Sequence, residues 1–560
     1  VLFYYKTSGL FFGLLLLVTC SDFIIAQLIY RCKTRPTKRL FLILSIIIDL
    51  SILCYFKYAY FFADLVNSVC GTSFQVTNIL AAEGNRLLGQ NFFNVDRIIL
   101  PVGISFYTFQ IISYTADVYR GLVKPVRNLL DFGFYVSFFP QLVAGPIVKA
   151  SDFIPQLYRK YCLSRTLFGM AVFWILNGLL KKIILSDYLA VNFIDRVFDN
   201  PMLFSGFENL MALFAYSLQV YADFSGYTDI AIGLSLLMGF HLPRNFNSPY
   251  KAPNCSNFWK RWHISLSRWL QNYLYIPLGG NRNATFGTYF WILTITFVAL
   301  ILSGNPYVAL SVLALAVIVV TVGLRCPDRR KKIWANLNSM ITMLLGGLWH
   351  GASCNFLIWG GLNGTGMIIY KFWRDFRPAV RMLWSLFILL IVGTLYTFAP
   401  SPLWNLMLVF MIFITASTII RWLYTWSGMN WHMEWLGHAW AVGVTFVFIT
   451  FTRLFFRSGS NLDPAIANET AWRIATEMVN QMGTAWNANI SDIIQAYYKV
   501  FALFVLGMII HWLPENWKRR YRIAFAKMPL SLMAVSVVIT VFIAYQFVTA
   551  EMQPFIYFQF

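Results

Sequence analysis

The sequence predicts an all-α, polytopic membrane protein, because of its composition and the spacing of its apolar runs. Hydrophobic residues make up 58% of the 560 residues and charged residues only 12%, which excludes an ordinary soluble domain or pair of domains. Apolar runs near 20 residues, the length that crosses a bilayer as a helix, recur along the chain. We therefore predict a single integral membrane domain over 1–560, with roughly 12 to 15 membrane segments.

The longest apolar runs give the first set of predicted spans. They lie near 8–30, 40–61, 129–147, 166–190, 287–303, 305–324, 382–400, 402–421, 437–455, 498–513 and 529–549. Shorter runs are broken by glycine and proline. Irregular backbone at membrane depth persists only where it is buried in protein or lines a wet cavity, so the broken runs indicate a site.

The charge pattern predicts the orientation. Four basic segments, 31–39, 325–332, 371–381 and 516–522, are expected in the cytosol by the positive-inside rule. The segments 62–97 and 456–496 are then extracytoplasmic. The net charge of +21 is explained by this topology rather than by nucleic-acid binding, although an anionic cytoplasmic donor would also benefit from it. The eight cysteines form no CxxC pair, so we expect neither a disulfide framework nor a structural metal.

The first polar interruption is "LPVGISFYTFQIISYTADVYRG" at 100–121, followed by "SFFPQLVAGPIVKASDFIPQL" at 137–157. Its helix breakers are Pro101, Gly103, Pro140, Gly145 and Pro146. They predict re-entrant or funnel-lining segments, with simple helix kinks as the alternative.

The second interruption has two parts. "YADFSGYTDIAIG" at 221–233 holds Asp223 and Asp229, and acids at membrane depth are expected to face the protein interior. Asp223 could orient a histidine or a backbone turn, and a purely structural role stays open. The following segment, 245–282, carries His263 amid apolar residues at helical spacing, which predicts an interfacial amphipathic helix. Those residues are Phe258, Trp262, Leu266, Trp269 and Leu270. On composition alone, His263 is a surface or capping histidine.

The third interruption, "MLLGGLWHGASCNFLIWGGLNG" at 343–364, places His350 in an otherwise apolar or small run. Because the flanking segments 325–332 and 371–381 are both basic, the chain must cross and return, with His350 near the turn. Desolvation favours the neutral imidazole, which can accept a proton, so a general base is one reading and a packed structural histidine the other. Cys354 lies four residues later, and on a continuous helix it could pair with His350 as a thiol nucleophile.

These motifs closely resemble the membrane-bound O-acyltransferase family, in its bacterial polysaccharide O-acetylating branch. The resemblance rests on "YADFSGYTDIAIGLSLLMGF", "NFWKRWHISLSRWLQNYLYIPLGGNR", "GGLWHGASCNFLIWGG" and the two proline-rich stretches quoted above. It covers most of 2–400, with 100–400 as the catalytic core, and extends more weakly to the terminal "QPFIYFQF".

The resemblance implies many tilted and re-entrant helices around a central funnel or tunnel, with the acyl donor on the cytoplasmic side and the acceptor on the other. It places the catalytic histidine at His350 and a second functional histidine at His263. Residues that could support or line the tunnel are Trp349, Asp223, Ser225, Asn257 and Trp262. His432, His438 and His511 lie outside the motifs and are expected to have no catalytic role. The family commonly has an aromatic residue at the Cys354 position, which argues against a cysteine nucleophile.

The chain also departs from the family pattern. Gln271 and Asn272 precede "YLYIPLGG" where relatives usually have Arg and Asp, and Asn363 is a further difference. The two spans within 286–325 have no counterpart in relatives, so we expect an inserted transmembrane hairpin there. Relatives tend to begin with one further apolar segment, and this chain begins without methionine, so we expect an incomplete amino terminus.

The resemblance implies acetyl transfer from acetyl-CoA, with no permanently bound cofactor, to a hydroxyl of an exported polysaccharide. An extracytoplasmic acetyltransferase partner could complete the transfer, and the bacterial cytoplasmic (inner) membrane is the expected location. D-alanyl transfer to teichoic acid from a carrier protein is the nearest alternative. A transporter is the alternative from another class, but it predicts an internal repeat and the chain has no second copy of the histidine motifs.

Overall fold

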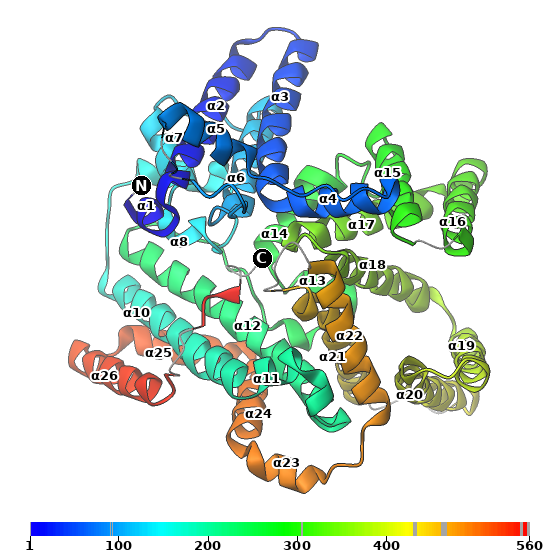
Figure 1. Ribbon diagram of the computed structural model, residues 1–560. Helices are drawn as coiled ribbons and strands as arrows, with labels where there is room; N and C mark the ends of the chain where they lie inside the picture. Colours follow the sequence, from blue (N-terminus) through cyan, green and yellow to red (C-terminus); the bar gives the residue numbers. More distant parts are fainter. Residues whose placement is uncertain are drawn as a thin grey trace.

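All regular secondary structure in the part described by the computed structural model is helical, with no β-strand there (Figure 1). The described residues are 2–89, 91, 93–303, 306–428, 434–460, 467–548 and 553–556. His432 and part of the predicted loop 456–496 lie outside them. The predicted all-α class is confirmed.

Six helical stretches are long and apolar enough to cross a membrane. They are Phe12–Arg31, Arg35–Cys70, Arg165–Asp199, Pro378–Phe398, Pro402–Trp426 and Glu434–Ser458. Two bent helix pairs raise the number of described spans to eight at most, which confirms a multi-pass membrane protein with fewer unbroken spans than the 12 to 15 segments predicted. The other predicted segments are shorter apolar helices, such as Phe286–Leu300 and Leu310–Arg325, or long helices with more polar and charged side chains, such as α12 (Gly206–Leu237) and α17 (Pro327–His350).

The amino-terminal part forms a hairpin and a set of short buried helices. Its helices are α1 Leu2–Ser8, α2 Phe12–Arg31, α3 Arg35–Leu53, α4 Ala59–Cys70, α5 Ile79–Leu88, α6 Ile104–Tyr119, α7 Leu129–Val136, α8 Phe139–Leu142 and α9 Ala150–Leu157. The α2–α3 hairpin projects at the top of Figure 1. Every residue of α6 from 104 to 118 is buried, so this polar helix is an interior wall.

The central part carries the two histidine motifs. Its helices are α10 Arg165–Leu180, α11 Asp195–Asp199, α12 Gly206–Leu237, α13 Cys255–Trp259, α14 Ile264–Leu270, α15 Phe286–Ser303, α16 Pro306–Arg325, α17 Pro327–His350 and α18 Cys354–Asp375. α10 packs along α12 through glycines whose backbones touch the partner helix, among them Gly178 and Gly233. α15 and α16 pack against each other as a helical pair within the predicted hairpin 286–325.

The carboxy-terminal helices are α19 Pro378–Phe398, α20 Pro402–Trp426, α21 Glu434–Ser458, α22 Ala467–Thr484, α23 Ile490–Ala496, α24 Tyr498–Trp512, α25 Glu515–Lys527 and α26 Leu530–Gln546. They lie along the lower side of the molecule in Figure 1, from α25 and α26 on the left to α19 and α20 on the right. The chain bends by 83° between α23 and α24 and by 117° between α25 and α26. The predicted spans near 498–513 and 529–549 correspond to α24 and α26, and each follows a sharp bend.

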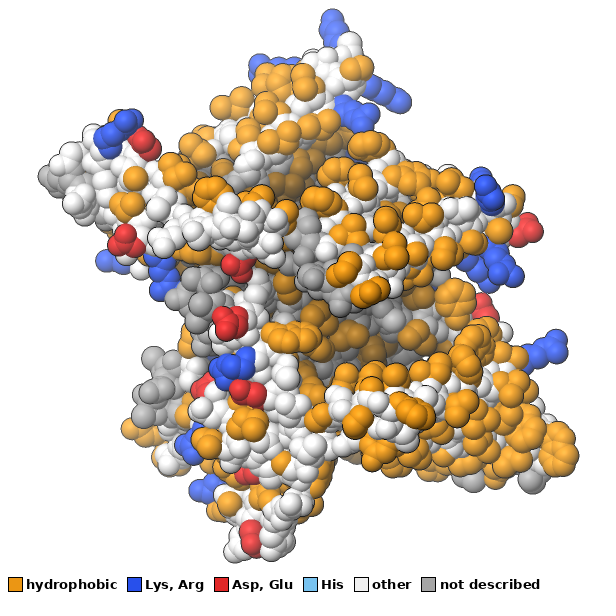
Figure 2. All heavy atoms as spheres, turned by 45° about the vertical axis from the view of Figure 1, so that its right-hand side comes forward, with side chains coloured by type: hydrophobic (Ala, Val, Ile, Leu, Met, Phe, Trp, Pro, Cys, Tyr) orange, Lys and Arg blue, Asp and Glu red, His pale blue; other side chains and the backbone are white. Residues whose placement is uncertain are grey.

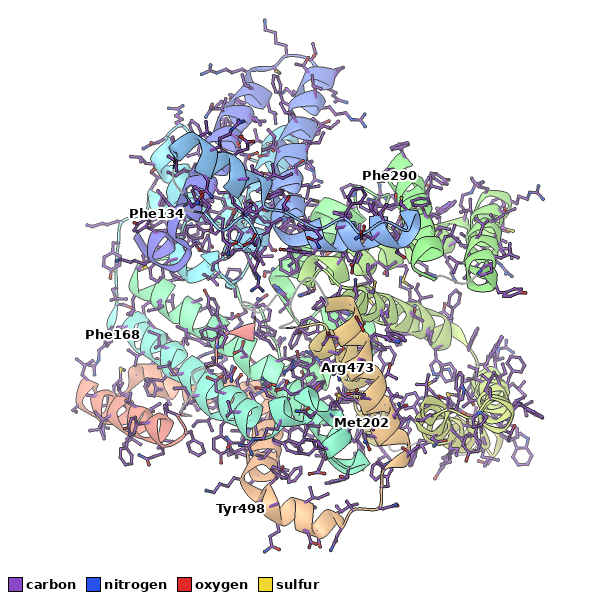
Figure 3. The ribbon with its side chains drawn as sticks, viewed as in Figure 1. Phe134, Phe168, Met202, Phe290, Arg473 and Tyr498 are labelled. Atoms are coloured by element: carbon purple, nitrogen blue, oxygen red, sulfur yellow. The ribbon has the colours of Figure 1, made fainter. Side chains whose placement is uncertain are left out.

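The exterior is apolar, as expected of a surface that faces lipid. Hydrophobic side chains cover much of the face in Figure 2, and the basic side chains gather at its margins. Phe290 on α15 is 49% exposed and Tyr498 on α24 is 60% exposed, and both lie at the periphery in Figure 3.

Two predicted elements are wrong. The predicted span 129–147 consists of the short helices α7 and α8 with a break at Ser137 and Phe138, and much of it is buried inside the protein. The predicted amphipathic helix around His263 is also broken, into α13 and α14. Its apolar residues, including Trp262 and Leu266, are buried rather than interfacial. In both cases the apolar pattern correctly indicated burial, but in protein rather than in lipid.

Close backbone packing of α17 on α18 sets the position of His350. A Cβ at Gly347 would collide with the carbonyl oxygen of Phe356 and lie 3.1 Å from the Cα of Gly360, and a Cβ at Gly360 would collide with the carbonyl oxygen of Met343. Only glycine permits this approach. The crossing therefore fixes the last turn of α17, which ends at His350.

We predict that Gly347→Ala lowers the thermal unfolding midpoint of the detergent-purified protein by several degrees, because overpacking against backbone costs about 1–3 kcal/mol. The matched control is Gly361→Ala, since a Cβ there meets only the Cδ2 of Leu344 at 3.4 Å. The control midpoint should stay within about one degree of the parent or rise, because alanine favours the helix by about 1 kcal/mol. Equal midpoints for the two variants would refute the close packing.

Candidate active site

The two histidines singled out in the sequence lie side by side in the interior. His350 is the last residue of α17, and His263 directly precedes α14. The exposed fractions of their side chains are 3% and 0%. Their ring centroids are 6.5 Å apart, with 63° between the ring planes. Two motifs that are distant in sequence therefore meet at one buried point.

The backbone of His263 adopts a left-handed conformation, with φ 41° and ψ 56°. This conformation costs an ordinary L-residue roughly 1–2 kcal/mol, and such strain persists where the surroundings fix it, often at functional sites. Asn245 supplies that fixation. Its backbone oxygen accepts from the Ile264 N–H at 2.9 Å, and its side-chain oxygen accepts from the Ser265 N–H at 3.0 Å and the Ser265 hydroxyl at 2.9 Å.

Asn245 also sets the proton position on the His263 ring. The Asn245 side-chain oxygen lies 3.2 Å from Nδ1 of His263. A backbone N–H can only donate, so the bond from Ser265 identifies this amide atom as the oxygen, an acceptor. Nδ1 of His263 must then carry the hydrogen, and in the neutral ring Nε2 is the acceptor nitrogen. Asn245 was missed in the sequence, where "NFNSPY" gave no sign that its first asparagine reaches His263.

Aromatic rings enclose His350. Its ring lies edge-on to Trp349 at 5.0 Å, Trp359 at 5.1 Å and Phe456 at 5.4 Å between centroids. Phe224 packs edge-on against His263 at 4.6 Å. Such an apolar enclosure strengthens the electrostatic interactions inside it and disfavours a charged imidazolium.

Trp349 and Trp262, both predicted as supporting residues, line this region. Trp349 stacks on Phe109 of α6 at 5.1 Å, and Phe109 stacks on Trp269 at 3.7 Å. Trp262 is the neighbour of His263 and packs against the guanidinium of Arg453 on α21, whose central carbon is 4.2 Å from the ring centroid. Arg453 is buried at 3% exposure, and no carboxylate of the described chain forms an ion pair with it.

The other three predicted supporting residues form no described hydrogen bond with His263 or His350. Asp223 accepts from Nζ of Lys182 at 2.7 Å and from the Ile556 N–H at 2.8 Å, so it orients backbone near the carboxy terminus and not a histidine. Asn257 accepts from Nε of Arg261 at 2.6 Å at the end of α13. Ser225 is buried in α12, and no hydrogen bond found among the described residues joins it to His263 or His350.

The second intramembrane acid is also paired. Asp229 accepts from Nζ of Lys181 at 2.6 Å and from the side-chain amide of Asn177 at 2.6 Å. Both acids of the motif therefore bind the lysine pair at 181–182 and join α12 to the segment that continues α10. Their predicted interior orientation is correct, and their described partners are structural.

A cavity of about 70 Å³ adjoins His350. The broken segment 100–106 supplies much of its wall, as the sequence led us to expect, together with Val143, Trp349, His350 and Lys57. Lys57 was missed in the sequence. A single lysine in the apolar run "LSILCYFKYAYFF" was the available signal, because an unpaired charge at membrane depth is costly.

Two further chemistries are not supported by this geometry. α17 ends at His350 and α18 begins at Cys354, so the two side chains do not share one face of a continuous helix. Among the described residues, no group of three or more His, Cys, Asp or Glu side chains is arranged to hold a metal ion.

Comparison with known proteins supports the resemblance. The family model described as "MBOAT, membrane-bound O-acyltransferase family" matches residues 123–323. The "Probable alginate O-acetylase AlgI" of Azotobacter vinelandii is 38% identical over 387 residues, covering 68% of this chain and 64% of that protein. The "Peptidoglycan O-acetyltransferase" of Helicobacter pylori is 34% identical over 378 residues, covering 62% and 59%. These matches confirm the resemblance to the family and to its bacterial polysaccharide-acetylating branch.

A more distant relative represents the alternative. The "Teichoic acid D-alanyltransferase" of Bacillus subtilis is 24% identical over 336 residues, covering 59% of this chain and 69% of that protein. The chain spans only 64% and 59% of the two O-acetylating relatives. Activity, substrates and partners are therefore matters for proposal.

We predict that Asn245→Ala lowers the activity of the histidine site about tenfold or more, because it frees the His263 ring and leaves the buried Ser265 N–H unpaired at a cost of about 1–3 kcal/mol. Asn245→Asp keeps an acceptor oxygen and should retain more activity than Asn245→Ala. The matched control is Asn192→Ala, whose side chain donates only to the Tyr188 carbonyl in its own helical segment. The measurement is activity at equal membrane abundance, and parental activity in Asn245→Ala would refute the role of this side chain.

Proposed function

We propose that this chain is an O-acyltransferase that moves an acetyl group to a hydroxyl of an exported polysaccharide. The observation that carries the proposal is the meeting of His350 and His263 at 6.5 Å inside an aromatic enclosure that adjoins a cavity. The names of the O-acetylating relatives support the acyl group and the class of acceptor.

In the proposed reaction, His350 is the general base. Its neutral imidazole takes the proton of the acceptor hydroxyl while the hydroxyl oxygen attacks the carbonyl carbon of an acyl thioester. The carbon–oxygen bond forms, the tetrahedral oxyanion collapses, and the carbon–sulfur bond breaks. The thiolate that leaves takes the proton back from His350, so the ring returns to its starting state. An acyl-histidine intermediate is the alternative course, in which a ring nitrogen attacks the thioester first.

His263 orients a reactant in this scheme. With its Nδ1 hydrogen directed at Asn245, the neutral ring presents an acceptor nitrogen, which fits a hydroxyl or N–H group of a substrate. It could stabilise a developing oxyanion only in its protonated form. The buried, apolar surroundings favour the neutral ring and hence the orienting role.

Acetyl-CoA is the proposed acyl donor, taken from the cytoplasmic side, and no permanently bound cofactor is required. The proposed acceptor lies on the opposite side of the bacterial cytoplasmic (inner) membrane, reached directly or through an extracytoplasmic acetyltransferase partner. The predicted orientation supports this assignment, because the basic segments 325–332 and 371–381 flank the helix pair that carries His350.

D-alanyl transfer to teichoic acid is the second candidate, on the strength of the Bacillus subtilis relative. It uses the same chemistry at the acyl carbon but a donor thioester on a carrier protein. Membranes given labelled acetyl-CoA or a labelled D-alanyl carrier separate the two candidates. Solute flux without acyl transfer from either donor would instead favour a transporter.

We predict that His350→Ala lowers acetyl transfer by a factor of about 10² to 10⁴, the range typical of losing a general base, and by more if the acyl group rides on the ring. His263→Ala should lower it as well, by a smaller factor. The measurement is transfer of label from acetyl-CoA to exported polysaccharide at matched membrane abundance.

The control is His438→Ala, because His438 is exposed on α21 and should be neutral to activity. His511 is a poorer control, since its Nε2 accepts from the Tyr250 N–H at 3.1 Å in the buried core. Near-parental transfer in His350→Ala would show that the histidine is structural and would refute the proposed mechanism.

A further inference from the structure

We propose that Lys57 is a positioning residue for the reaction, acting through His350 by holding the carbonyl end of α17. The inference rests on the proposed function, because it assigns Lys57 a role in presenting the proposed base. α17 ends inside the protein at His350. The last carbonyl groups of a helix have no partner within the helix itself.

Side chains from one short segment occupy those carbonyl groups. Nζ of Lys57 donates to the Trp349 carbonyl at 2.7 Å and to the His350 carbonyl at 3.2 Å. The Tyr58 hydroxyl donates to the Leu348 carbonyl at 2.8 Å. Three consecutive carbonyls, the last being that of His350 itself, are thus bound by two consecutive side chains.

The local backbone explains how two neighbouring residues reach the same helix end. Residues Cys54–Tyr58 form a π-helical turn between α3 and α4, and α4 extends sideways from the lower end of α3 toward α15 in Figure 1. A π-helical turn widens the helix and changes the direction in which its side chains point, and such turns occur frequently at functional sites.

The Lys57 amino group is bonded by the helix end and not by an acid. No carboxylate of the described residues lies within ion-pair distance of Lys57. Its remaining described hydrogen bond goes to the hydroxyl of Ser105 at 3.4 Å. The carbonyl end of a helix carries a partial negative charge, so an ammonium there is stabilised. The carbonyl groups of Trp349 and His350 therefore hold the Lys57 amino group at the end of α17.

The contact between Lys57 and the end of α17 lies at the wall of the cavity. Lys57, Ser105, Trp349 and His350 all line the 70 Å³ cavity. The ammonium is also 5.9 Å from the centroid of the Trp349 ring. Loss of the ammonium would release the last turn of α17 at the point where His350 faces this space. A displacement of about 1 Å at a reacting group can cost a factor of about 10².

The test compares Lys57→Met, which keeps the length of the side chain, with Lys57→Arg, which keeps the charge and the donors. Lys57→Met should lower kcat for transfer from labelled acetyl-CoA about tenfold or more, with KM changed less than about twofold. Lys57→Arg should restore a substantial part of the loss. Tyr58→Phe removes one of the three carbonyl contacts and should have an intermediate effect.

The matched control is Lys371→Met. Lys371 is a partly buried lysine on α18 that donates to the side chain of Asn336 at 3.0 Å, away from the histidines. Its loss should leave kcat within about twofold of the parent. A purely structural role for Lys57 would lower the abundance of both Lys57 variants and leave the activity per folded protein unchanged.

A second readout needs no activity. Carbethoxylation of His350 by diethylpyrocarbonate, followed by mass spectrometry with exposed His438 as the internal reference, should be severalfold faster in Lys57→Met than in the parent and near parental in Lys57→Arg. If this rate changes while His350→Ala remains active, the proposed function fails and the positioning of His350 by Lys57 stands. Parental kcat or a parental His350 modification rate in folded Lys57→Met would overturn the inference.

Discussion

The site depends on one constraint, that backbone polar groups exposed by a helix break in the interior must find partners there. α17 stops at His350, and the chain turns back into α18 inside the protein, where the two helices pack closely. Carbonyls left open by that turn cost free energy unless they are bonded. Lys57 and Tyr58 bind them. The His350 ring, the aromatic enclosure and the cavity all follow from the position of this bonded helix end.

On the opposite side of the site, Asn245 binds the backbone N–H groups that are exposed at the start of α14. His263 occupies a strained left-handed conformation, and one side-chain amide binds both the start of α14 and the histidine ring. The intramembrane acids Asp223 and Asp229 instead form ion pairs with the lysines at 181–182. The basic side chains of Lys57 and Arg453 lie near the histidines, and no carboxylate of the described residues forms an ion pair with either of them. Such surroundings favour negative charge developing on a reactant.

Sequence reasoning captured what local pattern controls. Apolar runs predicted the helical class and most of the unbroken spans. It failed where partners come from far along the chain. The run 129–147 has the composition of a span, yet burial against other helices lets it break after Val136. The residues near 258–270 have helical spacing, but Asn245 imposes a break at His263 that no local propensity signals.

The candidate residues divide in the same way. Trp349 and Trp262 lie beside the predicted histidines in sequence, and in the structure Trp349 lines the cavity while Trp262 packs against Arg453. Asp223 was predicted to orient a histidine or a backbone turn, and its described partners are Lys182 and the backbone N–H of Ile556 near the opposite end of the chain. Lys57 was overlooked because its partners, the carbonyls of residues 349 and 350, are invisible in a sequence.

The proposed function requires that His263 and His350 lie side by side, and crosslinking in native membranes tests this proximity most directly. A variant with His263→Cys and His350→Cys should be bridged by a short bifunctional thiol reagent, because the parent ring centroids are 6.5 Å apart. A pair with His350→Cys and His438→Cys, treated identically, should not be bridged. Efficient bridging of the first pair alone is the predicted result. Failure to bridge it, with both cysteines shown to react singly, would contradict the account.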